Sequence, residues 1–453
     1  MKFKPYEEYK KVDLPWIDEI PSHWEINRGK NIFKKEKRKV LDKHEVITCF
    51  RDGEVTLRKN RRSSGFTESL KEIGYQGIKK GDLVIHQMDA FAGAVGVSDS
   101  DGKGSPVYSV CNGKISINNS YYAFVIREMA RNGYIESLSR GIRERSTDFR
   151  FKTFSEQLYF IPPKEEQDKI ADFLDYNLAK IDRFVELTER QIELLKEQKE
   201  VLINDAVTKG IDKNVEYKDS GIDWIGEIPE HWEVTRLKYI SQILNGGTPS
   251  SSVPEFWNGD ISWVTPKDLS KVTKYVYASD RKITKEGYKN CSTSLIPENN
   301  IIMATRAPIG NIRINKIETT INQGCKGILV DKNLIDLNYL YFLLNNYLKE
   351  LQLLGNGAIF VELSTNNLSQ FKINIPPIVE QQQIVSYIDE ETNKIDRTIE
   401  LYKNQIHEQV INKGKINGQA RAMVITSSIE RAIEYYYAIE NLWLEEKVSI
   451  RPL

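Results

Sequence analysis

The sequence predicts an α+β fold in which two tandem domains are separated by two long helices that pair as an antiparallel coiled coil. The first observation behind this is an uninterrupted run, residues 164–209, that contains neither Gly nor Pro. Its apolar residues recur at alternating spacings of four and three, which is typical of a coiled-coil seam. At 1.5 Å per residue the helix would be roughly 65–70 Å long, so it needs a partner helix to cover its narrow apolar stripe.

The second observation is an internal duplication. The Ile-Pro-Pro of residues 161–163 recurs 214 positions later, at residues 375–377. Residues 16–28 recur 208 positions later, at residues 224–236, and most of those positions are identical. A repeat of about 210 residues is too long for a solenoid and indicates that a domain and its following helix were duplicated. Because each helix follows its own domain, we expect the two helices to run antiparallel.

The heptad pattern identifies the residues that we expect to pack between the helices or to bind partner chains. These partner-binding residues are Leu174, Leu178, Ile181, Val185, Ile192, Leu195, Ile388, Ile395, Ile399 and Ile406. The second helix should end by Lys413, because Gly414 and Gly418 disfavour helix. Beyond it, residues 422–426 read as a strand and residues 428–446 as an amphipathic helix, with no counterpart in the first half.

These signals divide the chain into five parts. We expect a first domain over residues 1–163, a first spacer helix over 164–213, a second domain over 214–377, a second spacer helix over 378–414 and an atypical tail over 415–453. Within the domains, residues 82–87 and 300–306 read as buried strands, and residues 338–354 as a helix that ends at Gly355. Long polar loops, such as residues 58–65 and 246–254, are where recognition is usually placed.

Composition excludes several classes of protein. Lys and Arg total 64 and Asp and Glu total 64, so the chain has no net basic charge, but residues 25–75 carry 14 basic against 8 acidic side chains. The four cysteines lie far apart, without a Cys-x-x-Cys pair, which disfavours a zinc ribbon or a disulfide framework. No signal-peptide core or long apolar run is found, and we therefore expect a cytoplasmic protein.

The sequence contains no recognisable catalytic constellation. It has no P-loop, no Gly-x-Gly-x-x-Gly after a strand, and no Asn-Pro-Pro-Tyr or Asp-Pro-Pro-Tyr of the kind used in methyl transfer. The histidines do not pair at metal-ligand spacing. The paired carboxylates at residues 165–166 and 390–391 are interpreted as solvated helix charges. The Trp- and His-containing repeat around His23 and His231 is interpreted as a packing clasp. We expect no metal, cofactor or catalysis in this chain itself.

Two similar domains held by paired helices suit a bipartite reader of double-stranded DNA, because half-sites recur along the duplex. Basic side chains neutralise phosphates or bind guanine, and the amides of Asn and Gln can bind adenine. The candidate DNA-binding residues are Arg58, Arg61, Arg62, Gln87, Arg143, Arg145, Lys267, Arg306, Arg313, Asn322 and Gln323. The alternative for each of them is an ordinary surface charge or amide.

Five segments resemble the DNA specificity subunit of type I restriction–modification systems. They are residues 224–234, Gly-Gly-Thr-Pro-Ser at 246–250, residues 261–269, Asn-Gln-Gly at 322–324 and Ile-Pro-Pro-x-x-Glu-Gln at 375–381. The resemblance implies two target-recognition domains, each reading one half of a split target, and helices that set the gap. It implies that methyltransferase subunits dock on the helices and bring restriction (motor) subunits. S-adenosylmethionine, ATP and magnesium would belong to those partners.

The chain departs from this family in two places. The first recognition domain has nothing like Gly-Gly-Thr-Pro or Thr-Pro-Lys-Asp, so its target should differ from that of the second. The tail from Gly418 is similar to a helicase-domain fragment of the motor subunit, which leads to the hypothesis of a gene rearrangement. The alternatives to a DNA reader are a rearranged, non-functional or scaffold-only remnant and a stand-alone modification enzyme.

Overall fold

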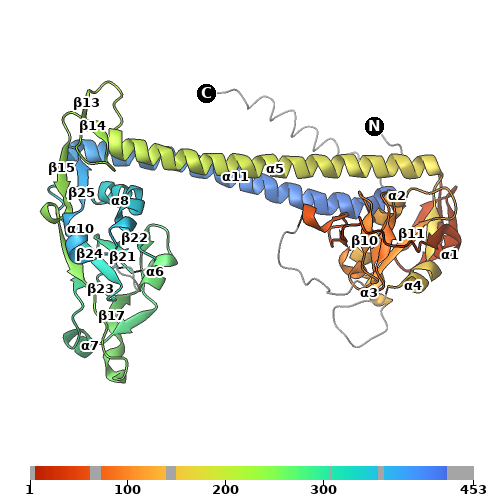
Figure 1. Ribbon diagram of the computed structural model, residues 1–453, viewed down its shortest axis with the longest axis horizontal. Helices are drawn as coiled ribbons and strands as arrows, with labels where there is room; N and C mark the ends of the chain where they lie inside the picture. The colour runs from red at the N-terminus through yellow and green to blue at the C-terminus, as the bar shows by residue number, and fades with distance from the viewer. Residues whose placement is uncertain (1–5, 62–72, 139–148, 307, 356–361, 426–453) are drawn as a thin grey trace. The chain divides into compact units, whose positions relative to one another are not determined.

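The structure is a computed structural model that describes residues 6–61, 73–138, 149–306, 308–355 and 362–425 (Figure 1). The chain divides into two compact units, residues 1–188 with 404–453 and residues 189–403. Each unit holds one β-rich domain together with parts of the long helices α5 (Lys164–Lys209) and α11 (Ile378–Ile425). The predicted α+β class, with two long helices that pack together, is confirmed.

The domain of the first unit is built on the antiparallel sheet β4–β11–β8–β9, which helix α2 (Asn119–Arg131) covers. The strands are β1 (Tyr9–Leu14), β2 (Ile17–Pro21), β3 (Glu25–Arg28), β4 (Phe33–Lys35), β5 (Ile47–Cys49), β6 (Val55–Leu57), β7 (Gln76–Ile78), β8 (Leu83–His86), β9 (Val95–Val97), β10 (Gly102–Gly104), β11 (Tyr108–Gly113) and β12 (Leu158–Ile161). The short helices are α1 (Gly29–Ile32), α3 (Tyr134–Ser137) and α4 (Phe151–Glu156), with 3₁₀ turns η1 (Arg58–Asn60) and η2 (Ala90–Ala92).

The core of this domain is aromatic and extends into the long helix. Trp24, Tyr121 and Phe160 are fully buried, and the first turns of α5 add Ile170 and Leu174 to the same cluster. Strand β12 leads directly into α5 and pairs antiparallel with β3. The first domain and the start of its helix therefore share one core.

The domain of the second unit contains two larger sheets, ordered β16–β24–β21–β22–β18 and β19–β17–β23–β20. Its strands are β13 (Tyr217–Asp219), β14 (Glu227–Pro229), β15 (Glu233–Arg236), β16 (Ser241–Asn245), β17 (Trp257–Val264), β18 (Tyr275–Val276), β19 (Arg281–Ile283), β20 (Leu295–Ile296), β21 (Ile301–Ala304), β22 (Gly310–Asn315), β23 (Thr319–Ile321), β24 (Cys325–Val330) and β25 (Lys372–Ile375). Its helices are α6 (Pro266–Ser270), α7 (Lys285–Lys289), α8 (Leu337–Asn346), α9 (Leu348–Leu353) and α10 (Thr365–Gln370), with 3₁₀ turns η3 (Leu237–Tyr239) and η4 (Pro254–Phe256).

The second domain repeats the way in which the first is joined to its helix. Strand β25 pairs antiparallel with β15 and leads into α11, as β12 pairs with β3 and leads into α5. Its core takes Ala206 and Val207 from the end of α5 and Ile384 and Ile388 from the start of α11. Helix α8 lies against β22, where Tyr339 and Leu343 are buried (Figure 1).

The two long helices pack together along the side that carries the predicted seam. Every predicted seam residue is buried or half-buried, whereas Leu187, Leu194 and Leu401, which lie off the seam, are 45%, 55% and 62% exposed. Within the second unit, Lys199 Nζ binds Asp396 Oδ1 and Oδ2 at 2.7 and 2.6 Å, and a Cβ on Gly210 would lie 3.3 Å from Glu380 Oε1. Since higher numbers on α5 meet lower numbers on α11, the pair is antiparallel.

One predicted helix end and one predicted continuous helix were wrong. Helix α11 does not end by Lys413 but continues through Gly414 and Gly418 to Ile425, so residues 422–425 are helical and not a strand. Glycine in a helix interior costs about 1 kcal/mol relative to alanine, which a long helix can absorb. The single helix predicted over residues 338–354 is two helices, α8 and α9, which meet at Tyr347. The tail helix predicted over residues 428–446 lies outside the described residues.

Candidate nucleic-acid interface

The turn between β23 and β24 brings two of the three predicted adenine-reading residues, Asn322 and Gln323, together. Asn322 Nδ2 donates to Thr248 Oγ1 at 3.0 Å, and Asn322 Oδ1 accepts from Gly324 N at 2.7 Å. The Thr248 hydroxyl in turn donates to Gln323 Oε1. Asn322 is half-buried and held on two sides, whereas Gln323 is exposed. Gln323 therefore presents its amide to solvent, and Asn322 fixes the turn that carries it.

The loop after β16 reaches this turn because it begins with glycine. A Cβ on Gly246 would lie 1.9 Å from the Asn322 carbonyl oxygen, so a larger residue there would force the two loops apart. The Gly-Gly-Thr-Pro and Asn-Gln-Gly segments, about 75 residues apart in sequence, are thus two parts of one surface. We call Thr248, Asn322 and Gln323 the amide cluster.

Two predicted basic contacts lie beside the amide cluster. A Cβ on Gly324 would lie 3.3 Å from Pro266 Cγ and 3.6 Å from Arg306 Cδ, which places the start of α6 and Arg306 next to the turn. Lys267 is exposed in α6, whose first turn is closed by hydrogen bonds between Thr265 and Asp268. The Arg306 side chain is 47% exposed, and its Nε donates to Glu362 Oε2 at 3.0 Å.

Sequence reasoning missed Lys326 and Glu362, which border this surface. Lys326 is only 5% exposed, and its Nζ donates to Asn245 Oδ1 at 3.0 Å. Burial lowers the pKa of Lys326, while the Glu362 carboxylate acts to raise it. The available signal was a single lysine inside the otherwise apolar strand β24, because a charged residue in a buried strand requires a polar partner.

Arg313 does not share the solvent-facing character of Arg306. Its Nε donates to the Val272 carbonyl at 2.6 Å and its Nη1 to the Ile312 carbonyl at 2.7 Å. Burial lowers the pKa of Arg313. These bonds join the loop after α6 to β22, so the side chain supports the fold of the second domain.

The predicted contacts of the first domain do not form one cluster in the described residues. Arg61 Nη1 pairs with Asp52 Oδ2 at 2.7 Å and with Glu54 Oε2 at 2.9 Å, and its guanidinium lies 4.3 Å from the Phe50 ring centre. Arg58 Nε donates to Thr48 Oγ1, and Gln87 Nε2 donates to Ser109 Oγ, both at 3.3 Å. Arg62, Arg143 and Arg145 lie outside the described residues.

The predicted packing clasp is present in both repeats. His23 Nε2 lies 2.8 Å from Glu166 Oε1, and Tyr6 OH donates to Glu166 Oε2 at 2.9 Å. His231 Nε2 likewise lies 2.8 Å from Glu380 Oε2. The interpretation of Glu166 as a solvated charge was therefore wrong. Burial, followed by the neighbouring Glu166 carboxylate, raises the pKa of Tyr6.

The other predicted carboxylate pair does lie on the helix surface. Glu390 Oε1 and Glu391 Oε1 pair with Lys394 Nζ at 2.9 and 2.6 Å, as i,i+4 and i,i+3 neighbours. Such exposed pairs give a helix only a few tenths of a kcal/mol. They provide no acid–base chemistry.

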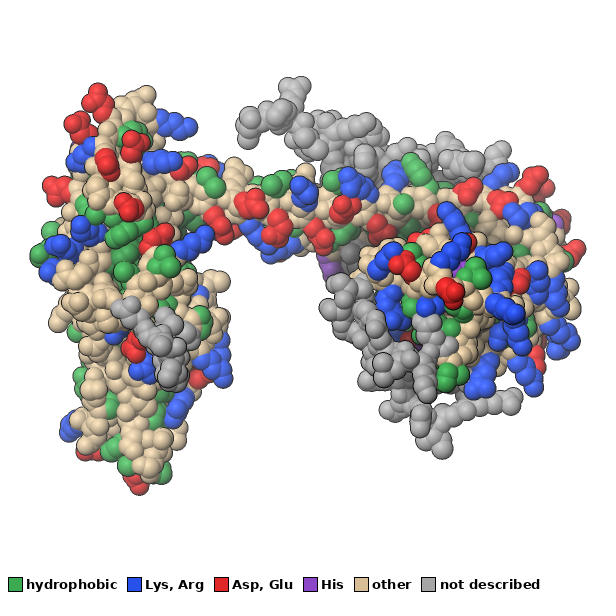
Figure 2. Space-filling view, in the orientation of Figure 1, with side chains coloured by type: hydrophobic (Ala, Val, Ile, Leu, Met, Phe, Trp, Pro, Cys, Tyr) green, Lys and Arg blue, Asp and Glu red, His purple; other side chains and the backbone are tan. Residues whose placement is uncertain are grey.

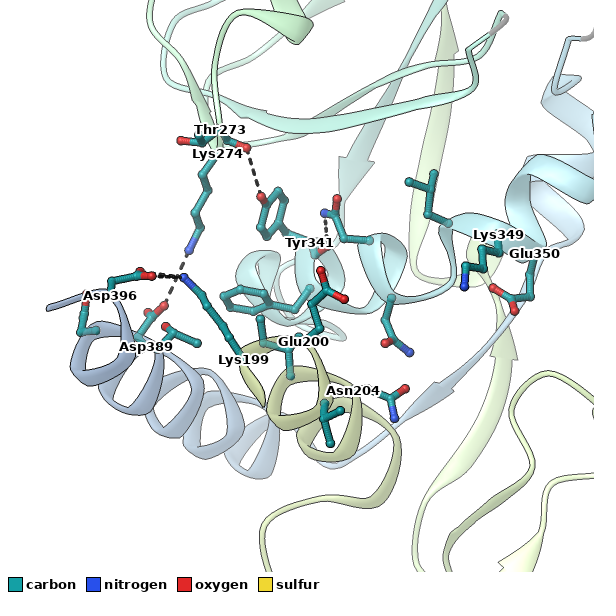
Figure 3. A pocket seen from close by; sticks show the side chains of 18 of the residues that line it. Lys199, Glu200, Asn204, Thr273, Lys274, Tyr341, Lys349, Glu350, Asp389 and Asp396 are labelled. Carbon is teal, nitrogen blue, oxygen red and sulfur yellow. Dashed lines mark hydrogen bonds and ion pairs between the residues drawn. The ribbon is translucent and has the colours of Figure 1, made fainter. Parts of the chain in front are cut away.

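A groove of about 1260 Å³ lies in the second unit between the helix pair and α8 (Figure 3). Tyr341 OH donates to the Thr273 carbonyl at 3.3 Å, and Lys274 Nζ lies 3.8 Å from Asp389 Oδ1. With the Lys199–Asp396 pair, these contacts tie α11 to the domain and to α5. The lining mixes both charges and shows no nucleophile–base pair.

Within the described residues, no group of three or more His, Cys, Asp or Glu side chains is arranged to hold a metal ion. None of the helices in that part of the chain is long and apolar enough to cross a membrane. All four cysteines are free thiols, as their spacing predicted.

Comparison with known proteins finds one matching domain and several similar proteins. Residues 229–437 match the type I restriction modification DNA specificity domain. The chain is 37% identical over 207 residues to the type I restriction enzyme MjaIX specificity subunit of Methanocaldococcus jannaschii, which covers 42% of this chain and 46% of that protein. It is 25% identical over 437 residues to the putative MjaX specificity subunit of the same organism, covering 92% and 95%.

Solved structures share the fold. A chain from a study of assembly and conformational transition of the type I R-M system has a TM-score of 0.63 at 15% identity, covering 88% of this chain and 98% of that one. The HsdS subunit from Thermoanaerobacter tengcongensis has a TM-score of 0.55 at 16% identity, covering 88% and 97%. Residues 229–437 therefore carry a type I restriction modification DNA specificity domain, and the chain is similar in sequence and fold to specificity subunits of type I restriction–modification systems.

Proposed function

We propose that this subunit binds double-stranded DNA and reads a bipartite target, with one recognition domain on each half-site. The observation that carries the proposal is the amide cluster with Lys267 and Arg306 beside it. This surface combines an exposed amide, which can bind a base edge, with cations that can bind phosphates. We assign residues 1–163 and 214–377 to the two recognition domains, and residues 164–213 and 378–414 to the spacer helices.

We further propose that the helices dock two methyltransferase subunits through their outward faces. Besides the seam, the 214-residue repeat keeps further helix residues identical, as the pairs Lys180/Lys394, Arg183/Arg397, Glu186/Glu400, Leu187/Leu401 and Gln191/Gln405. All of these residues are exposed except Lys180 and Gln405, which are half-buried. Leu187 is 45% exposed and Leu401 62% exposed. A leucine kept at the same exposed position of both copies, with the same charged neighbours, fits two copies of one partner. The seam itself is already filled by this chain.

The catalytic work would then belong to the partner subunits. S-adenosylmethionine would be used by the methyltransferases, and ATP and magnesium by restriction subunits that join through them. This subunit contributes recognition and assembly and no catalysis, and we place it in the cytoplasm with its complex.

The origin of the tail stays a hypothesis. Its support is the likeness of the segment from Gly418 to a helicase-domain fragment of the motor subunit and the end of the heptad pattern after Ile406. Two observations weigh against a junction at Gly418: the family match runs to residue 437, and α11 continues to Ile425.

The test is methylome sequencing of a host that expresses this subunit with its cognate methyltransferase. We expect one split target, of which exchange of residues 1–163 alters only one half. Methylation without a split target, or a change in both halves together, would contradict the two-domain assignment.

The purified chain incubated with S-adenosylmethionine and DNA should be inactive, since activity on its own would favour a stand-alone modification enzyme. A chain that binds no DNA would be a scaffold or remnant.

A further inference from the structure

Three lysines share one side of the extended segment that begins in β4. Lys35, Lys37 and Lys39 are exposed, whereas the intervening Glu36 and Arg38 are half-buried. Exposed and half-buried residues alternate from Lys35 to Lys39, as side chains do on the two sides of a strand, so the three lysines lie on the exposed side of the segment. We call these three residues the lysine strip. Figure 2 shows Lys and Arg side chains gathered over one face of the first unit.

The inner side of this segment is neutralised within the protein. Arg38 Nη2 donates to Asp82 Oδ1 at 3.2 Å, and Glu36 pairs with Lys34 at 3.2 Å and with Arg38 at 3.4 Å. The lysine strip is different, because none of its three residues forms an ion pair with a carboxylate of the described part of the chain. Its positive charge is therefore directed to solvent.

The lysine strip borders a hollow of about 490 Å³, and none of the described residues that line it is acidic. The lining residues are Lys35, Lys37, Arg38, Lys39, Gly74, Tyr75, Gln76 and Pro106. The two walls are fixed to one another, since Gly77 N donates to the Arg38 carbonyl at 3.0 Å. Gln76 Nε2 donates to the Tyr108 carbonyl at 2.8 Å, so the second wall is also bonded to β11.

This arrangement fits an anionic polymer better than Arg61, one of the arginines predicted from the sequence of this domain. Arg61 is shared between Asp52 and Glu54, and releasing it would leave two carboxylates near the ligand. The lysine strip needs no such release. A row of cations beside Tyr75 provides the types of donor that proteins use on successive phosphates.

We propose that the lysine strip, with Tyr75, binds the phosphate backbone of DNA and positions the first recognition domain without reading bases. The proposal rests on the DNA-binding function proposed above and names the contact that the sequence reading missed. The available signal was the alternation of lysines at positions 35, 37 and 39.

The test compares the full-length wild-type chain with K35Q/K37Q/K39Q, using fluorescence anisotropy with a random-sequence DNA duplex at about 50–200 mM salt. Each phosphate contact contributes about 0.9 to the slope of log affinity against log salt, so three contacts should lower the slope by about 2.7. At 0.1 M salt the affinity should fall by more than about tenfold. K35R/K37R/K39R should keep the wild-type slope.

A second control removes the same charge elsewhere. K169Q/K196Q/K209Q neutralises three exposed lysines of α5 and should leave the slope unchanged. An unchanged slope in K35Q/K37Q/K39Q, while the wild type binds with a steep slope, would overturn this inference and leave the proposed function standing. Loss of slope in the arginine variant would also overturn it. A wild-type chain that does not bind the duplex would overturn the proposed function itself.

Discussion

The indole Nε1 of Trp24 donates to Glu166 Oε2 at 3.0 Å, which fastens the first domain to the first turn of the helix that follows it. Trp232 Nε1 makes the same bond to Glu380 Oε1 at 3.1 Å. Both tryptophans are fully buried, so their N–H groups have no access to water. The Glu of the repeated Ile-Pro-Pro-x-x-Glu-Gln motif therefore has a structural role in both halves.

The next residue of the motif, a glutamine, makes further hydrogen bonds between each domain and the long helix that follows it. Gln167 Nε2 donates to the Pro162 carbonyl and Gln167 Oε1 accepts from Asn118 N, at 2.8 and 2.9 Å. Gln381 repeats this with Pro376 at 2.8 Å and Asp336 N at 2.7 Å. Asn118 and Asp336 are the N-caps of α2 and α8. Each glutamine thus links a long helix to the start of the main helix of its domain.

Glu166→Ala should destabilise the first unit. The change leaves the buried Trp24 N–H without its acceptor, and an unsatisfied buried donor costs about 1–3 kcal/mol. Urea denaturation followed by tryptophan fluorescence should show the loss. Glu165→Ala, one residue earlier on the exposed side of the same turn, should change stability by less than about 0.5 kcal/mol. Equal effects of the two variants would contradict the structural role of Glu166.

Gln323→Ala should relax recognition at one half-site without unfolding the protein. A bidentate amide contact with a base is worth about 1–3 kcal/mol of discrimination, and Gln323 is the exposed amide of the amide cluster. Competition binding with single-base variants of the methylated target measures this discrimination. Asn322→Ala should in addition lower stability, because Asn322 Oδ1 accepts the Gly324 N–H. Unchanged preference at every base in Gln323→Ala would remove Gln323 from the base contacts.

Arg313→Ala should cost stability and leave DNA affinity unchanged. Its guanidinium donates to two backbone carbonyls of the second domain, and their loss should cost about 1–3 kcal/mol. Arg306→Ala is the matched variant, since this side chain is half exposed beside the amide cluster. We expect Arg306→Ala to weaken DNA binding with little effect on unfolding. A reversed pattern in the two variants would place the DNA contact at Arg313.

Leu187→Glu and Leu401→Glu should each remove one methyltransferase from the assembled complex, and the double variant should remove both. A carboxylate in an apolar contact is desolvated without a partner, which is costly. Native mass spectrometry of the co-purified complex gives the stoichiometry. Leu353→Glu changes another leucine, 84% exposed in the second domain, and should leave two methyltransferases bound. Full assembly of the double variant would exclude the outward helix faces as the docking site.

The long-range organisation was predictable because it depends on periodicity and repetition. Helix α5 begins and ends at the residues expected, since Pro163 precedes its start and Gly210 adopts a positive φ of 78° after its end. The break between α8 and α9 at Tyr347 carries no such sequence signal, because neither Gly nor Pro occurs there. Leu343 of α8 and Leu351 of α9 both pack into the core of the second domain, so the break depends on tertiary packing.

The candidate site was predictable only in part. Asn322 and Gln323 were predicted from the sequence. Their contact with Thr248 was not, because it depends on the close approach of two loops, which Gly246 permits. The sequence did not distinguish Arg306 from Arg313, because both are arginines near strand ends and only the fold decides which guanidinium is enclosed. Glu166 was misread because its donors, Tyr6, His23 and Trp24, lie more than 140 positions away in the chain.

Gly414→Ala and Gly418→Ala test where the second helix ends. Since α11 continues through both positions, each alanine should stabilise helix by up to about 1 kcal/mol, through lower backbone entropy in the unfolded chain. Circular dichroism during thermal unfolding should show a higher midpoint and no loss of helix content. If the helix instead ended at Lys413, as the glycines predicted from sequence, neither change would raise the midpoint. Gly210→Ala provides the contrasting control, because Gly210 lies beyond the end of α5 at a positive φ where alanine is strained and should destabilise.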